Sequence, residues 1–136
     1  MEQAIMRDPL FLSQVSRPAT KADLAIGQDL LDTLSANRDR CVGMAANMIG
    51  VACRVIIVNM GMFDVVMYNP LILEKSGPYQ TEEGCLSLEG SRPTVRYKDI
   101  KVAFFDQNWQ KKELNLTGFA AQICQHELDH LEGILI

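Results

Sequence analysis

The pentapeptide HELDH at positions 126–130 constrains the fold most, because it contains both histidines of the 136-residue chain. On an α-helix, residues four positions apart lie one above the other, so the two imidazoles can converge on one cation. Glu127 projects about 100° around the helix from His126, where it can hydrogen-bond a water held on a metal. The pattern predicts a helix with His126 and His130 as metal ligands and Glu127 as general base. The alternative is a chance match on a solvated helix face.

The third metal ligand has to be a cysteine, an aspartate or a glutamate, since a catalytic site needs at least three protein ligands and no third histidine exists. Cys124 lies two residues before the first histidine, which turns it to the opposite side of the helix. Cys53 opens an apolar run that is typical of a buried strand. Cys41 and Cys85 remain, and Cys85 is favoured because it follows a glycine between two strand-like segments. Spacing alone does not decide between these two.

Three short motifs occur in order along the chain: Gly43-Met44-Ala45-Ala46, Glu83-Gly84-Cys85-Leu86-Ser87, and Gln125 with the HELDH pentapeptide. They resemble the motifs of the peptide deformylases, whose patterns are GxGxAAxQ, EGCLS and HExDH. The second and third patterns are matched without a gap. The resemblance covers most of the chain and implies an α+β fold, with antiparallel sheets packed around a central C-terminal helix that carries HExxH.

This resemblance implies a metal-dependent hydrolase that removes the N-formyl group from N-formylmethionyl peptides of nascent proteins. It implies that Cys85, His126 and His130 hold one divalent metal, with Glu127 as the acid/base. The backbone N–H of Leu86 is expected to donate to the formyl oxygen. The family favours Fe²⁺ in the cell, and thiolate and imidazole ligands also suit Zn²⁺, Ni²⁺ or Co²⁺ in the isolated protein.

Motif one departs from the family pattern at two positions. Met48 stands where the family has the glutamine that hydrogen-bonds the formyl oxygen, and Cys41 stands where it has the first glycine. A thioether has no N–H to donate, and losing one such donor typically costs about 100- to 1000-fold in rate. Asn47 carries an amide, but neighbouring residues point in different directions. Weak deformylation, an altered substrate and a non-catalytic binding role all remain open.

The substrate is expected to be an N-formylmethionyl peptide, supplied by nascent chains at the ribosome. Its methionine side chain requires an apolar pocket, and its backbone is expected to add to a strand edge near motif one. The residues expected to line the substrate site are Gly43, Met44, Met48, Gly84 and Ile123. Arg96 resembles the family's arginine near the substrate exit.

Composition excludes several other functions. Hydrophobic residues at 48% and charged residues at 22% are typical of one globular domain, here residues 1–136. A net charge of −4 with 13 scattered basic residues argues against nucleic-acid binding. Apolar runs of only about six residues are too short for a bilayer. Without a signal-peptide pattern, and with irregularly spaced cysteines, we expect a cytoplasmic chain with reduced thiols.

The expected elements follow from apolar periodicity and from turn residues. A helix is predicted from about residue 24 to 37 after a capping box at Thr20 and Asp23, followed by a small-residue turn at 43–46. The last helix is predicted from residue 118 or 119 to about 131, between an N-cap at Thr117 and Gly133, and its apolar contacts are Phe119, Ile123, Leu128 and Leu131. Strands are predicted at about 52–59, 65–68, 71–75, 93–97, 100–105 and 111–116, separated by glycine and proline.

A zinc metallopeptidase is the main enzymatic alternative, because it shares HExxH. The second motif, at residues 83–87, and the absence of a further His or Glu ligand motif downstream argue against it. A non-catalytic binding protein is the alternative that Met48 keeps open.

Overall fold

The structure, a computed structural model, describes residues 1–85 and 87–135, and of residues 88 and 89 only the backbone. The helices are α1 (Pro9–Leu12), α2 (Leu24–Ala36) and α3 (Gly118–Leu131), with 3₁₀ turns η1 (Lys21–Asp23) and η2 (Ala46–Ile49). The strands are β1 (Gly43–Ala45), β2 (Val55–Asn59), β3 (Asp64–Cys85), β4 (Leu88–Phe105) and β5 (Lys111–Thr117). The fold is α+β, as predicted.

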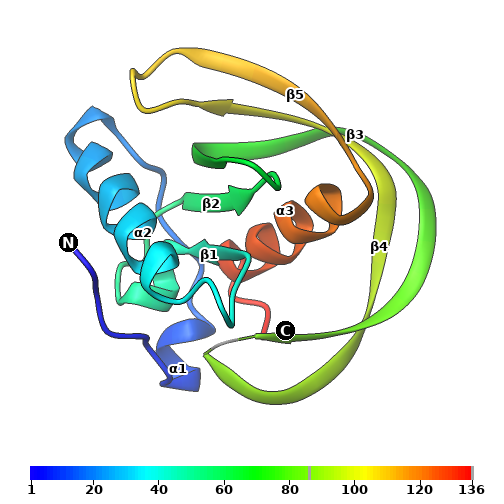
Figure 1. Cartoon of the computed structure of the whole chain (residues 1–136), viewed down its shortest axis with the longest axis horizontal. Helices are drawn as coiled ribbons and strands as arrows, with labels where there is room; N and C mark the ends of the chain where they lie inside the picture. The colour runs from blue at the N-terminus through cyan, green and yellow to red at the C-terminus, as the bar shows by residue number, and fades with distance from the viewer. Residues whose placement is uncertain (86, 136) are drawn as a thin grey trace.

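The strands form an antiparallel sheet in the order β1-β2-β3-β4-β5. The long β3–β4 ribbon curves around α3, while α2 lies on the other side of β1 and β2 (Figure 1). Strand β2 is buried on both faces because its side chains alternate between two apolar cores. Val55 and Ile57 pack in the core that contains α2 residues, whereas Ile56 and Val58 pack in the core that contains α3 residues.

Helix α3 has the bounds that the sequence predicts, and its inner face is apolar. Ala121, Cys124 and Leu131 are buried in the core beneath it. The predicted contact of Phe119 is wrong, because this ring is 63% exposed. Thr117 occupies the N-cap position, although its side chain makes no capping hydrogen bond. At the other end, Gly133 has φ +75°, a conformation that favours glycine.

The predicted division of the middle of the chain into short strands is wrong. The segments expected at 65–68 and 71–75 belong to one strand, β3, and those at 93–97 and 100–105 belong to β4. Pro78 stays within the ladder, opposite Tyr97. The reason is that β2 pairs with β3 only as far as Tyr68, so the rest of β3 has a free edge in the described pairing, where proline is tolerated.

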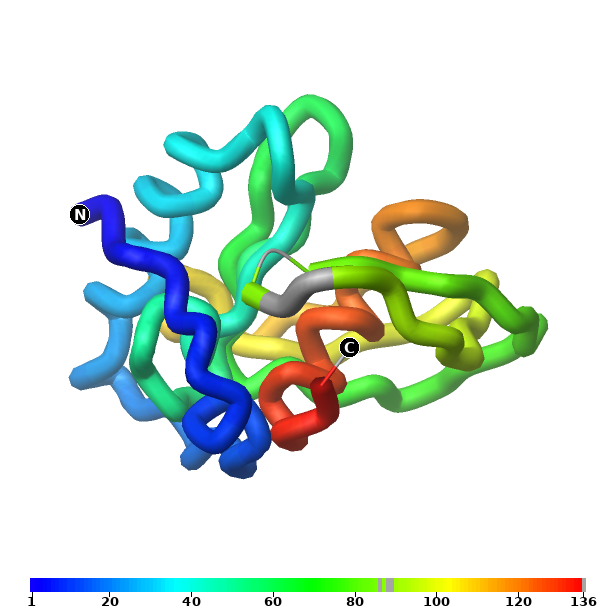
Figure 2. The backbone as a smooth tube through the Cα atoms, turned by 90° about the horizontal axis from the view of Figure 1, so that it is seen from below, coloured from blue at the N-terminus to red at the C-terminus, as the bar shows by residue number. Residues whose placement is uncertain are grey.

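The predicted turn at 43–46 is also wrong, because residues 43–45 form β1, paired with β2. The chain turns immediately afterwards, in η2. Figure 2 shows the N-terminal segment beside the C-terminal end of α3, where Ser16 donates its backbone N–H to the carbonyl of Leu131 at 2.8 Å. Among the helices of the described residues, none combines the length and the apolar character needed to cross a membrane.

Candidate metal centre and hydrolytic site

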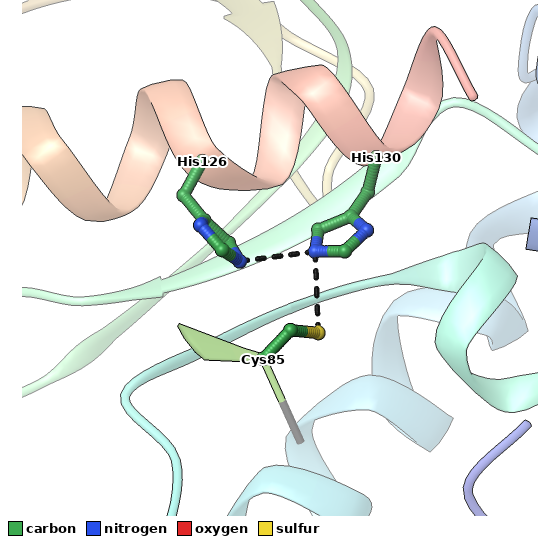
Figure 3. A group of neighbouring side chains, drawn as sticks. All are labelled: Cys85, His126 and His130. Atoms are coloured by element: carbon green, nitrogen blue, oxygen red, sulfur yellow. Dashed lines mark hydrogen bonds between the residues drawn. The ribbon is translucent and has the colours of Figure 1, made fainter. Parts of the chain in front are cut away.

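Two histidines from one face of α3 meet a cysteine at the end of β3 (Figure 3). The Nε2 atoms of His126 and His130 lie 3.0 Å apart, and the Sγ atom of Cys85 lies 3.3 Å from His130 Nε2. The ligand atoms of the three residues all lie within 4.8 Å of one another. The structure thus brings together residues from β3 and α3 that are more than 40 positions apart in the sequence.

A buried ion-pair network holds the first histidine. Glu83 Oε1 lies 2.7 Å from His126 Nδ1, and Arg96 donates to both oxygens of the same carboxylate at 2.7–3.1 Å. Gln122 adds a hydrogen bond to Glu83 Oε2 at 2.9 Å, and Arg96 also donates to Asp129 at 2.6 Å. With its Nδ1 held in this way, His126 directs Nε2 towards the other two ligands.

Arg96 belongs to this network and not to a substrate exit. Its side chain is 4% exposed and lies between Glu83 and Asp129. A buried guanidinium needs such anionic partners, because desolvation of an unpaired charge is costly. The arginine therefore supports the candidate metal ligand His126 through Glu83.

The surroundings shift the pKa values of the two histidines in opposite directions. Burial raises the pKa of Glu83, but hydrogen bonds from His126, Arg96 and Gln122 outweigh it and lower the pKa to about 2. Burial, followed by the positive charges of His126 and Arg96, lowers the pKa of His130 to about 3, so this imidazole is neutral. For His126, burial lowers the pKa, but Cys85 and Glu83 outweigh it and raise the pKa. The neutral ring of His130 offers a lone pair to a divalent metal, whereas His126 holds a proton that a bound metal would displace.

Glu127 lies in the same site without a strong partner. It is buried, and its Oε1 atom has no hydrogen-bond partner among residues 1–85 and 87–135. Burial is the main cause that raises the pKa of this carboxyl to about 7. A Cβ atom at Gly43 would lie 3.1 Å from Glu127 Oε2, so the glycine allows β1 to approach this carboxylate closely. A carboxyl that titrates near neutrality can both accept and donate a proton.

A cleft of about 270 Å³ opens beside these residues. Of the five residues predicted for the substrate site, four line it: Gly43, Met48, Gly84 and Ile123. Met44 is fully buried in the core next to α2, and the structure does not bring it to the cleft. The predicted N–H donor, Leu86, lies outside the described residues.

The motif-one side of the cleft is largely apolar. Met48 is buried, and its Sδ atom lies 3.5 Å from the backbone N–H of Ala45, from which it accepts a weak hydrogen bond. Asn47 turns away from the cleft and donates Nδ2 to the carbonyl of His130 at 2.8 Å. Cys41 lines the cleft, but burial and the negative charge of Glu127 raise the pKa of its thiol to about 12. A thiol in that state is a poor metal ligand.

The residues present fit a metal ion. Two nitrogen ligands at about 2.0 Å from a tetrahedral ion lie about 3.3 Å apart, close to the separation of the two Nε2 atoms. Cys85, His126 and His130 supply one soft and two intermediate ligands, a set that suits Zn²⁺, Fe²⁺ or Co²⁺. The carboxylate of Glu83 provides the outer hydrogen bond that metal-binding histidines usually make.

Comparison with known proteins agrees with this geometry. The sequence model of the family described as "Polypeptide deformylase" matches residues 4–136. The chain belongs to the peptide deformylase family. Members of this family are metal-dependent hydrolases that remove the N-formyl group from nascent peptides, and this assignment favours neither a metallopeptidase nor a binding module.

The family relatives cover the chain broadly. A peptide deformylase of Clostridium beijerinckii is 53% identical over 136 residues, which is the whole of both chains. Peptide deformylase 1 of Clostridium perfringens is 41% identical over 111 residues, covering 79% of this chain and 74% of that protein. Both similarities are high enough to show common family membership.

Solved deformylase structures share the fold. A K1U-bound class I type b peptide deformylase from Acinetobacter baumannii has a TM-score of 0.89 and 31% identity, covering 99% of this chain and 96% of that chain. A Met-Ala-Ser-bound structure of the same kind of enzyme has a TM-score of 0.87 and 31% identity, covering 99% and 97%.

Sequence reasoning did not recognise three residues that surround the ligands: Glu83, Gln122 and the buried Arg96. Glu83 and His126 are 43 positions apart, and periodicity carries no information about such a contact. The available signal was the acidic residue two positions before Cys85, on the same face of an extended strand. Side chains two positions apart in a strand lie on the same face, so Glu83 could have been predicted to lie beside the candidate ligands.

Proposed function

We propose that this chain hydrolyses N-formylmethionyl peptides at one divalent metal held by Cys85, His126 and His130, with Fe²⁺ as the metal in the cell. The observation that carries the proposal is the convergence of these three residues, two of which, Cys85 and His126, line the cleft together with Glu127. Family membership supports the reaction, and the donor set supports the metal. Acting on nascent chains, the protein would work in the cytoplasm as one domain of residues 1–136.

Glu127 would carry the proton in this reaction. A bound divalent metal supplies Lewis-acid polarisation of the formyl carbonyl and of the attacking water. The carboxylate of Glu127 takes a proton as the water oxygen bonds to the formyl carbon. It then delivers that proton to the amine as the C–N bond breaks, so formate and a free N-terminus leave. The burial that raises its pKa to about 7 matches both steps.

Stabilisation of the developing negative charge would be weaker than in relatives that carry the family glutamine. The thioether of Met48 accepts a hydrogen bond from Ala45 and has no proton to donate. The backbone N–H of Leu86 would be the remaining donor. We therefore expect deformylation at a reduced rate with the metal site intact.

The substrate would enter along β1. This strand is at one end of the sheet order, so one of its edges has no strand partner among the described residues and could pair with a peptide strand. Met48, Ile123 and Phe119 supply apolar surface in the cleft for the methionine side chain. The structural neighbour with bound Met-Ala-Ser supports a peptide of this kind.

Metal content and formate release test the proposal together. Protein purified without oxygen should contain one metal per chain and release formate from formyl-Met-Ala, and it should not cleave unblocked Met-Ala-Ser. Glu127→Ala should lower formate release by about 10²- to 10⁴-fold while the metal stays bound. Glu132→Gln, a change at an exposed carboxylate just after the same helix, is the matched control and should leave the rate unchanged. Formate release that survives Glu127→Ala would contradict the mechanism.

A further inference from the structure

The two histidine ligands differ in how their second ring nitrogen is held. Nδ1 of His126 lies 2.7 Å from Glu83, whereas Nδ1 of His130 is buried without a hydrogen-bond partner in the described part of the chain. His130 is 0% exposed, so bulk water does not reach the ring. Metal-bound histidines almost always donate this second N–H to an acceptor, and an unsatisfied buried donor costs about 1–3 kcal/mol.

A buried amide with a free acceptor lies next to the same residue. Asn47 is 1% exposed and donates Nδ2 to the backbone carbonyl of His130 at 2.8 Å. Because a carbonyl can only accept, the amide orientation is fixed, with Nδ2 towards the helix and Oδ1 as the free acceptor. Oδ1 also has no partner among the residues that the structure describes. A free donor and a free acceptor thus occur on two residues that are already joined by a hydrogen bond.

A third free polar group lies at the same end of α3. Ser16 is buried, donates its backbone N–H to Leu131 at 2.8 Å, and has a hydroxyl without a partner in the described residues. Buried waters typically make two to four hydrogen bonds to such groups. We propose that Asn47 is a positioning residue for His130, and that one buried water joins Asn47 Oδ1 to His130 Nδ1–H, with the Ser16 hydroxyl as a further partner.

This arrangement would decide which nitrogen binds the metal. An acceptor at Nδ1 keeps the proton there, so the lone pair of Nε2 faces His126 and Cys85. The segment that lacks the family glutamine would then still act on the metal, through Asn47. The inference rests on the proposed metal site.

Two substitutions separate the acceptor from the rest of the amide. Asn47→Leu keeps a similar shape and removes both polar atoms, whereas Asn47→Asp keeps an acceptor and removes the N–H donor. Asn37→Leu is the matched control, because Asn37 is also buried and donates to a backbone carbonyl, that of Thr33, at 2.8 Å but at the end of α2. The readout is the rate at which Zn²⁺-loaded protein releases Zn²⁺ to excess EDTA, with the melting temperature of each metal-free variant as a check of folding.

We expect Asn47→Leu to release Zn²⁺ about 10- to 100-fold faster than the parent protein. Asn47→Asp should stay within about threefold of the parent, and Asn37→Leu should release Zn²⁺ at the parent rate despite a lowered melting temperature. Release from Asn47→Leu at the parent rate, or equally fast release from both Asn47 variants, would overturn the inference. If Asn47→Leu does not fold, Asn47→Ala takes its place. Failure of the parent protein to bind Zn²⁺ would overturn the metal site as well, and so differs from failure of this inference.

Discussion

The two walls of the cleft are built differently. On the β3–β4 and α3 wall, Glu83, Arg96 and His126 form a buried, fully hydrogen-bonded charge network. On the β1–η2 wall, the thioether of Met48 accepts one weak hydrogen bond, and Asn47 has one unpaired amide oxygen in the described structure. We therefore expect mutations in the charge network to change metal binding and mutations of Met48 to change the reaction rate, while Asn47 connects the second wall to His130.

The largest effect on stability is expected from removing a charge from the network of Glu83, Arg96 and His126. Arg96→Met should destabilise the metal-free protein by about 3–5 kcal/mol, because it removes the buried guanidinium that pairs with both Glu83 and Asp129. Urea unfolding measures this change. Arg54→Met is the control, since its partner Glu132 is exposed and such a pair contributes less than about 1 kcal/mol. Equal losses for the two variants would show that the network does not stabilise the fold.

The same charge network predicts that the stability of the fold depends on pH. The pKa of Glu83 falls from its ordinary 4.5 to about 2 on folding, so this group stabilises the fold above pH 4.5, and that contribution is lost as pH falls towards 2. Glu83→Gln should thus cost stability on the order of 3 kcal/mol at pH 6, and the cost should shrink between pH 4.5 and 2. Urea titrations of metal-free parent and variant across this range give the difference directly. A cost that is the same at pH 6 and pH 2 would contradict the assignment.

The stability of the protein should depend on the side-chain size at Gly43, where β1 packs against Ile123 of α3. A Cβ atom at Gly43 would lie 2.5 Å from Ile123 Cγ2, so Gly43→Ala should cost about 1–3 kcal/mol through overpacking. Ile123→Ala removes the methyl group in question. In that background Gly43→Ala should cost clearly less, and thermal unfolding of the four proteins in this double-mutant cycle measures the coupling. If the destabilisation caused by the two substitutions is strictly additive, the cost of Gly43→Ala does not come from contact with Ile123.

Introducing a hydrogen-bond donor at position 48 should raise the rate of formate release. Met48→Gln supplies an N–H near the developing charge and should increase formate release from formyl-Met-Ala by about 10- to 100-fold, with metal content unchanged. Met48→Leu has similar bulk and no donor, and it should stay close to the parent rate. If Met48→Gln leaves the rate unchanged, the missing donor does not limit this enzyme.

The sequence predicted helices α2 and α3 well, missed the short helix α1, and predicted the ribbon poorly. The bounds of α3 followed from local signals, namely the HELDH pentapeptide and the flanking Thr117 and Gly133. Proline and glycine near residues 77–78 were read as the end of a strand, because local chemistry does not reveal that this part of β3 has a free edge. Where a strand is paired on only one edge, a proline can remain within the strand.

In the site, too, local motifs were predicted and contacts between distant residues were not. The candidate ligands and Glu127 were predicted from their motifs, and the structure brings these residues together. The contacts of Glu83 with His126 and of Asn47 with His130 span 43 and 83 positions, which no spacing rule predicts. Met44 was predicted from its place in motif one, but alternation along β1 turns it into the core.

X-ray absorption at the zinc K-edge of the Zn²⁺-loaded protein tests the central claim most directly. We predict one sulfur ligand at about 2.3 Å and nitrogen or oxygen ligands at about 2.0 Å, with the sulfur signal lost in Cys85→Ser and kept in Cys41→Ser. A spectrum without sulfur, or a sulfur signal that survives Cys85→Ser, would contradict the metal centre formed by Cys85, His126 and His130.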